Sequence, residues 1–164
     1  MKDPVLGSVL RAQLDRAVSL AAASDILRVS HDGSATPRRY VAQFSCTSLI
    51  KIAGQEPRKT EAQFDFGICF PDDYLREPEP KQVVTVLRPW TVYHPNVAGP
   101  FICLGRLTGG TPIDDILFQI YEIISYQKWS AHDGLNEEAC EWARGHQDLF
   151  PLDRRPLKRK ESNA

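Results

Sequence analysis

The sequence lacks the features that mark several large classes of protein. Its four cysteines contain no Cys-x-x-Cys pair, and their wide spacing does not indicate a disulfide framework. No apolar run approaches the ~20 residues needed to span a bilayer, and the N-terminus has no apolar core typical of a signal peptide. Charge of one sign is not in excess, with 20 Lys and Arg against 21 Asp and Glu. We therefore expect a cytoplasmic protein with no nucleic-acid partner and no membrane partner.

The composition is that of a folded domain. Hydrophobic residues make up 42% of the 164 residues and charged residues 25%, which are ordinary values for a globular protein. We expect one domain over residues 1–150. Residues 151–164 carry five basic and two acidic side chains, and this polar composition predicts a basic, disordered tail.

Hydrophobic periodicity predicts an α+β fold. The spacing is helical near the N-terminus, where Asp3 could cap a helix that begins at Pro4. Alternating patterns then predict neighbouring strands in an antiparallel meander of about four strands, followed by helices on one face or end of the sheet. The expected elements are a helix over 4–29, strands over 40–50, 64–70 and 81–87, an irregular segment over 88–112, and helices over 114–129 and 136–145.

The irregular segment contains a candidate nucleophile. A cysteine in such a segment of a reduced protein is a candidate for covalent catalysis through its thiolate, and here it is Cys103. Asn96 lies seven residues before it and could donate a hydrogen bond to an oxyanion. Pro95 restricts His94 to extended conformations and stiffens the segment.

Three sequence blocks resemble the ubiquitin-conjugating enzymes, the E2 or UBC family. YHPNVAGPFICLG (93–105) resembles the family's active-site signature, FGICFPDDYLREPEP (66–80) its proline-rich segment, and DGLNEEACEWARGH (133–146) the start of its late helix. The resemblance extends over roughly residues 5–150 and implies a UBC-like fold, with an N-terminal helix, a meander sheet, an irregular active-site segment and two C-terminal helices.

The resemblance also implies a reaction and its partners. A family member accepts a ubiquitin-like protein from an activating enzyme (E1) as a thioester and transfers it to a target lysine. By position Cys103 is the acceptor, Asn96 supports the oxyanion or orders the loop, and Asp133 orients or deprotonates the lysine. His94 and Pro95 are expected to be structural. No cofactor and no metal is implied, because the activating enzyme uses the ATP.

Several positions depart from the family pattern. Of the usual Trp-Ser-Pro after the cysteine only Pro112 is present, Arg76 replaces an apolar residue that meets a ligase (E3), and Gly134 replaces a proline. These departures make recognition by an E3 uncertain and suggest a divergent member, such as those of bacterial ubiquitin-like conjugation operons linked to antiphage defence. Arg11 and Arg16 could contact an activating enzyme or be only solvated.

Other functions remain open from the sequence. A non-catalytic ubiquitin-binding scaffold could use the same fold. A cysteine hydrolase would pair Cys103 with His94 or His132. A zinc site built from His132, Cys140 and His146 has unsuitable spacing and lacks a fourth ligand.

Overall fold

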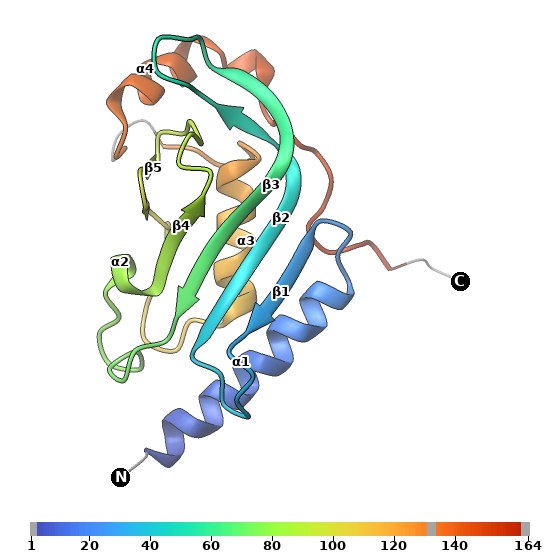
Figure 1. Cartoon of the computed structure of the whole chain (residues 1–164), viewed down its shortest axis with the longest axis vertical. Coiled ribbons are helices and arrows are strands. Elements are labelled where there is room, and N and C mark those ends of the chain that lie inside the picture. Colours follow the sequence, from blue (N-terminus) through green and yellow to red (C-terminus); the bar gives the residue numbers. More distant parts are fainter. Residues whose placement is uncertain (1–2, 131–133, 162–164) are drawn as a thin grey trace.

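The structure is a computed structural model that describes residues 3–130 and 134–161. A four-stranded antiparallel sheet has helices packed on one of its faces (Figure 1), so the α+β expectation is confirmed. In chain order the elements are α1 Pro4–Ala22, β1 Leu27–His31, β2 Arg39–Ile50, β3 Arg58–Cys69, α2 Pro80–Val83, β4 Val84–Arg88, β5 Val97–Ala98, β6 Phe101–Ile102, α3 Ile113–Ile124, α4 Glu137–Gly145 and the 3-10 turn Gln147–Leu149.

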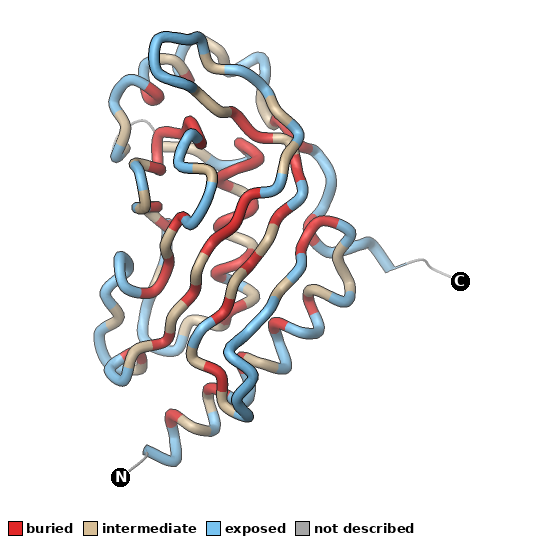
Figure 2. The backbone as a smooth tube through the Cα atoms, viewed as in Figure 1, coloured by how far each residue is buried: buried red, intermediate tan, exposed pale blue. Residues whose placement is uncertain are grey.

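The sheet is a simple meander in the order β1-β2-β3-β4. Its centre is the long β2–β3 pair, whose register runs from Arg39 opposite Cys69 to Ile50 opposite Arg58. Alternation places every second side chain of a strand on the helix-covered face, and this is visible as the alternating buried positions in Figure 2. That face carries the main core.

Two helices cover this face. Helix α3 lies behind the sheet and α1 runs beside β1 (Figure 1). The predicted start of α1 is confirmed, because the Asp3 carboxylate accepts a hydrogen bond from the Val5 N–H at 2.9 Å and Pro4 is the first helical residue. Gln13 then joins the two helices, since its side chain accepts from the Ile113 N–H at 2.7 Å and donates to the Thr111 carbonyl at 3.1 Å.

The predicted extent of the first helix over 4–29 is wrong. The helix ends at Ala22, and residues 27–31 form the edge strand β1. The Ser24 hydroxyl accepts hydrogen bonds from the N–H groups of Ile26 and Leu27 at 3.1 and 3.0 Å, which turns the chain. Pairing with β2 and burial of both aliphatic side chains then outweigh the helical propensity of the preceding alanines.

Other boundaries also differ from the prediction. Strand β3 begins at Arg58, six residues before the expected start at residue 64. The expected strand over 81–87 begins at Val84, after a helical turn. The expected helix over 114–129 ends at Ile124, and Tyr126 has a left-handed φ of 57°. The Asn136 cap of α4 is confirmed by a 3.1 Å hydrogen bond from the Ala139 N–H.

The chain after residue 150 is packed, so a disordered tail is wrong for residues 151–161. Leu152 and Leu157 are buried. Asp153 accepts the Thr47 N–H at 2.9 Å, which attaches this arm to β2. The Arg159 N–H donates to the Ala23 carbonyl at 2.8 Å, at the end of α1. The prediction failed because the segment is polar on average, although two separate leucines, Leu152 and Leu157, attach this arm (residues 151–161) to the core.

Replacing Leu157 with alanine is expected to destabilise the fold. The side chain is only 2% exposed, so truncation should lower the free energy of unfolding by about 2–4 kcal/mol. Urea denaturation measures this. Leu149→Ala is the control, because Leu149 is 48% exposed and should change stability by less than about 0.5 kcal/mol. Equal effects of the two substitutions would contradict the packed arm.

Candidate active site

The candidate nucleophile follows a small hairpin. Strands β5 and β6 pair through Val97 and Ile102, and Gly99 with a φ of +56° allows the tight reversal between them. The next pair along the ladder is Asn96 and Cys103, and the Cys103 N–H donates to the Asn96 carbonyl at 2.8 Å. Backbone pairing therefore holds the cysteine and the asparagine opposite each other.

His94 has a structural position. It is fully buried, and its Nδ1 accepts the Asn96 N–H at 2.9 Å. This leaves Nε2–H to donate to the Lys128 carbonyl at 3.2 Å. Both ring nitrogens are thus occupied by backbone groups, and burial lowers the pKa of His94 to about 3. The imidazole cannot serve as a base for Cys103, which contradicts the hydrolase dyad with His94.

Pro95 connects the active-site segment to α4. Its carbonyl accepts the N–H groups of Leu135 and Asn136 at 2.7 and 3.1 Å. Gly134 lies tightly in this contact, because a Cβ there would be 2.2 Å from the Cys140 sulfur and 3.0 Å from the Pro95 carbonyl oxygen. This close packing explains why residue 134 is a glycine and not the proline that the family resemblance leads one to expect.

Within residues 3–130 and 134–161, a backbone contact orients the Asn96 side chain. Its Oδ1 accepts the Ser130 N–H at 3.2 Å, and the residue is only 8% exposed. Because the carbonyl end is engaged in this way, the amide NH₂ is the end available to donate into the cavity beside Cys103. Asn96 can therefore order the loop and support an oxyanion at the same time.

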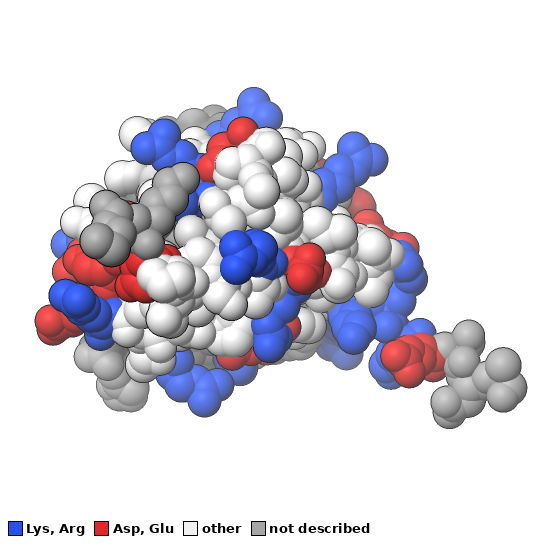
Figure 3. Space-filling model, turned by 90° about the horizontal axis from the view of Figure 1, so that it is seen from below, with Lys and Arg blue, Asp and Glu red and all other residues white. Residues whose placement is uncertain are grey.

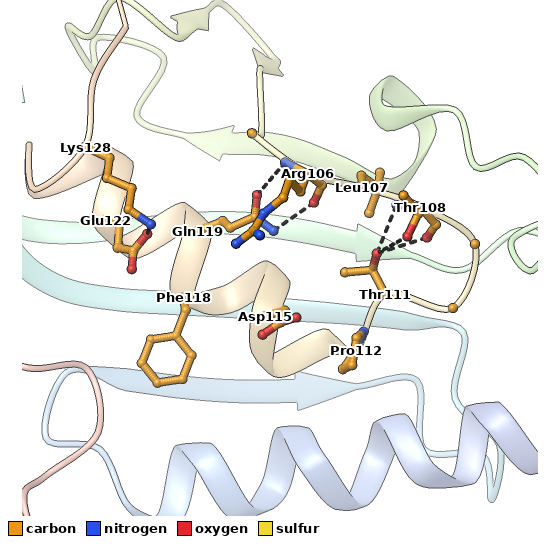
Figure 4. Close-up of a pocket in the computed structure, with 13 residues that line it drawn as sticks. Arg106, Leu107, Thr108, Thr111, Pro112, Asp115, Phe118, Gln119, Glu122 and Lys128 are labelled. Carbon is orange, nitrogen blue, oxygen red and sulfur yellow. Dashed lines mark hydrogen bonds and ion pairs between the residues drawn. The ribbon is translucent and has the colours of Figure 1, made fainter.

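Cys103 lines a cavity of about 350 Å³ together with Asn96, Trp129 and Ser130. The thiol is half-buried, so it is open to a reactant but partly shielded from water. The cavity widens into an open groove of about 760 Å³ that runs along α3 (Figure 4). The two hollows share Gly105, Arg106, Gln119, Glu122 and Lys128.

Gln119 holds the segment after Cys103 against α3. Its side-chain oxygen accepts the Arg106 N–H at 2.9 Å, and its NH₂ donates to the Arg106 carbonyl at 2.8 Å (Figure 4). Nearby, Lys128 and Glu122 form an ion pair at 2.6 Å. The sequence reasoning missed Gln119, because a polar residue on the outer face of an amphipathic helix carries no signal of its distant partner.

The other three cysteines differ in their surroundings. Cys46 is fully buried, and burial raises the pKa of its thiol to about 12. Cys140 is also buried, against Gly134. Cys69 is half-buried on β3. Of the four, only Cys103 lines either of the two hollows.

The four residues expected to meet partners lie on elements that converge at one end of the fold. The loop bearing Arg76 contacts the loop before Pro112, since a Cβ on Gly109 would be 2.3 Å from the Leu75 carbonyl oxygen. Tyr74 joins the same loops by donating its hydroxyl to the Thr111 carbonyl. On α1, Arg11 is exposed and Arg16 forms an ion pair with Asp114 of α3 at 3.4 Å.

Charges of both signs are mixed on the lower end of the molecule (Figure 3). No group of three or more metal-binding side chains occurs among residues 3–130 and 134–161. No helix in that same part of the chain is long and apolar enough to cross a bilayer.

Two residues with expected catalytic roles, Asp133 and His132, lie outside the described residues.

The buried His94 predicts a pH dependence of stability. Its folded-state pKa of about 3 lies below the usual ~6.5, so between these values the unfolded chain binds a proton that the folded protein does not. The free energy of unfolding should therefore fall as the pH drops, by about 2 kcal/mol between pH 7 and pH 5. His94→Gln keeps a donor and an acceptor without titrating, and urea denaturation should show this loss reduced. An unchanged pH slope would contradict the assignment.

Comparisons with known proteins relate this geometry to one fold. No protein-family model and no curated protein matches the sequence. Among solved structures, the E2 domain of a ubiquitin conjugating enzyme from Toxoplasma gondii matches with a TM-score of 0.55 and 17% identity, over 86% of this chain and 90% of that chain. The chain therefore has a UBC-like fold.

Proposed function

We propose that this protein is a conjugating enzyme that carries a ubiquitin-like modifier as a thioester on Cys103 and transfers it to a lysine of a target protein. The observation that supports this most is the position of the half-buried thiol, which is paired with Asn96 at a cavity that adjoins the groove along α3. A groove leading to a nucleophile suits the extended C-terminus of a modifier.

The reaction has two acyl transfers. In charging, the Cys103 thiolate attacks the thioester carbonyl on the activating enzyme, a new C–S bond forms, and the thiolate of the activating enzyme leaves. In discharge, a neutral lysine amine attacks the Cys103 thioester, a C–N bond forms, the C–S bond breaks, and the amine loses a proton. The amide NH₂ of Asn96 stabilises the oxyanion in the discharge step, and Asp133 receives the proton or orients the amine.

The partners follow from this reaction. The activating enzyme supplies the charged modifier and uses the ATP, so this chain needs no cofactor. Arg11 and Arg16 on α1 are the proposed contacts for that enzyme. The joined loops bearing Arg76 and Pro112 are the proposed site for a ligase, if the reaction uses one. Four free cysteines support a reducing cytoplasm, and a bacterial antiphage conjugation operon is the proposed source of modifier and activating enzyme.

A charging assay tests the proposal. The purified protein is incubated with ATP and host lysate, and then with a verified activating enzyme and its modifier. We expect an ATP-dependent band, heavier by one small protein, that disappears with thiol reductant on a gel. Mass spectrometry of this band identifies the modifier. Absence of the band with verified partners would contradict the proposal and favour a non-catalytic scaffold.

A further inference from the structure

Two charged side chains of the groove along α3 are not neutralised by the rest of the protein. The Arg106 guanidinium and the Asp115 carboxylate both line the groove. Within the part of the chain that the structure describes, neither group forms an ion pair or a side-chain hydrogen bond. By contrast, the two remaining charges of the groove, Lys128 and Glu122, pair with each other at 2.6 Å. The groove therefore offers an occupant one free positive charge and one free negative charge.

The positive charge is held at the junction of the cavity and the groove. Arg106 follows Cys103 by three residues and lines both hollows. Gln119 accepts the Arg106 N–H at 2.9 Å and donates to its carbonyl at 2.8 Å, which fixes the main chain against α3 (Figure 4). A chain that leaves a thioester on Cys103 along the groove therefore passes this guanidinium.

Helix α3 sets the order of the two charges. Asp115, Gln119 and Glu122 are spaced i, i+4 and i+7, so they lie along one face of the helix (Figure 4). Glu122 lines both the cavity of Cys103 and the groove, whereas Asp115 lines only the groove. Asp115 is thus one helical turn farther along the groove than Gln119, which holds Arg106. One turn rises about 5.4 Å, close to the length of two residues of extended chain.

Main-chain groups of the lining segment are largely used within the protein. The Thr108 N–H donates to the Thr111 hydroxyl at 2.9 Å, and the Thr111 N–H donates to the Thr108 carbonyl at 3.1 Å. The Arg106 N–H is bound to Gln119. A strand that adds to a sheet edge needs a row of free N–H groups, and these three are occupied. We therefore attribute discrimination between occupants to the two free charges.

We propose that Arg106 and Asp115 select the C-terminal tail of the modifier by its order of charges, with an acidic side chain on Arg106 and a basic side chain, two residues earlier in the tail, on Asp115. This inference rests on the proposed function, which places the modifier on Cys103. Residues two apart in an extended tail point to the same side. The three residues from Cys103 to Arg106 span at most roughly 10 Å, so the acidic residue lies within about three positions of the C-terminal residue.

The experiment compares two synthetic peptide thioesters of a neutral small thiol. The first peptide carries glutamate two residues before its C-terminal glycine and lysine two residues before that glutamate. The second exchanges the lysine and the glutamate, so composition and net charge are equal. In each reaction the Cys103 thiolate attacks the thioester carbonyl, a new C–S bond forms, and the small thiol leaves. The readout is the ratio of the two acylation rates at Cys103, followed by mass spectrometry of its proteolytic fragment.

The wild-type ratio should favour the first peptide by about fivefold at low salt. It should fall toward one at about 1 M salt, because the ions screen exposed charges. Cys69 is another half-buried thiol and lines neither hollow, so its ratio in the same sample should be one. A ratio near one at Cys103 at low salt, or the same preference at Cys69, would overturn the inference.

Charge reversal tests the two residues. Arg106→Gln should lower the ratio toward one, and Arg106→Glu combined with Asp115→Lys should invert it. Arg28→Glu reverses another exposed arginine, on β1, that lines neither hollow and should keep the wild-type ratio. A ratio that stays at the wild-type value in both Arg106 variants, or that falls equally in Arg28→Glu, would overturn the inference.

The outcomes separate this inference from the proposed function. Charging by a verified activating enzyme together with a peptide ratio of one would overturn the inference and leave the proposed function intact. A fivefold ratio without charging by verified partners would contradict the proposed function, while the selection by charge order in the groove would stand. The modifier identified in the charging assay provides a further check, because a tail with the opposite order of charges would overturn the inference.

Discussion

Replacing Cys103 with alanine is expected to abolish the thioester adduct. Alanine has no sulfur to form the acyl bond, and removal of a nucleophile typically costs more than about 10³-fold in rate. The adduct should therefore be undetectable on a non-reducing gel under conditions that charge the wild type fully. Mass spectrometry of the intact protein provides the second measurement, because a single acyl addition has a defined mass.

Two matched controls give this prediction its specificity. Cys69→Ala removes another half-buried thiol, and Cys140→Ala removes a buried one. Both variants should charge as the wild type does. Equal loss of the adduct in a folded Cys140→Ala variant would contradict the assignment of Cys103 as the acceptor.

Replacing Asn96 with aspartate is expected to slow discharge onto lysine by about 10²–10³-fold. Aspartate keeps an oxygen that can accept the Ser130 N–H, which Asn96 Oδ1 accepts at 3.2 Å. It loses the NH₂, which is the donor proposed for the oxyanion, and adds a negative charge close to the reacting carbonyl. The substitution thus preserves the loop contact while it removes the donor.

Single-turnover kinetics measures the Asn96 effect. Charged protein is mixed with excess lysine, and the loss of thioester is followed with time. Asn96→Ala, which removes both contacts, separates the two roles: loop ordering alone predicts that aspartate behaves nearly as the wild type, whereas oxyanion support predicts that aspartate is at least as slow as alanine. Discharge should also slow more than charging. Wild-type discharge in both variants would exclude a role in the oxyanion.

Much of the fold could be predicted because it depends on local patterns. Alternation of Phe64, Phe66 and Ile68 predicts a strand with one buried face, and the structure buries all three side chains. The caps at Asp3 and Asn136 are read from residues next to their helices, and both are confirmed. Each of these patterns involves residues within a few positions of one another, and at that range the side chains themselves determine the backbone conformation.

Elements that depend on distant partners could not be predicted in this way. The helical pattern predicts a helix that continues to residue 29, but residues 27–31 form β1 because β2 offers them a pairing edge. The arm after residue 150 looks too polar to fold, yet Leu157 fills a space in the core and Asp153 accepts a backbone N–H from β2. Neither the β1–β2 pairing nor the packing of the arm can be recognised from the residues of the segment alone.

The candidate site shows the same division. The sequence by itself determined that Cys103 and Asn96 share one short segment, and the resemblance of that segment to a family signature singled them out. Tertiary structure alone decided which end of the Asn96 amide is engaged, because the Ser130 N–H donates to its Oδ1. It also decided that His94 is no base and that Gln119 holds the segment after the cysteine. The reason is physical: the type of a side chain sets what chemistry it can perform, but the direction in which it donates or accepts depends on backbone groups that only folding brings beside it.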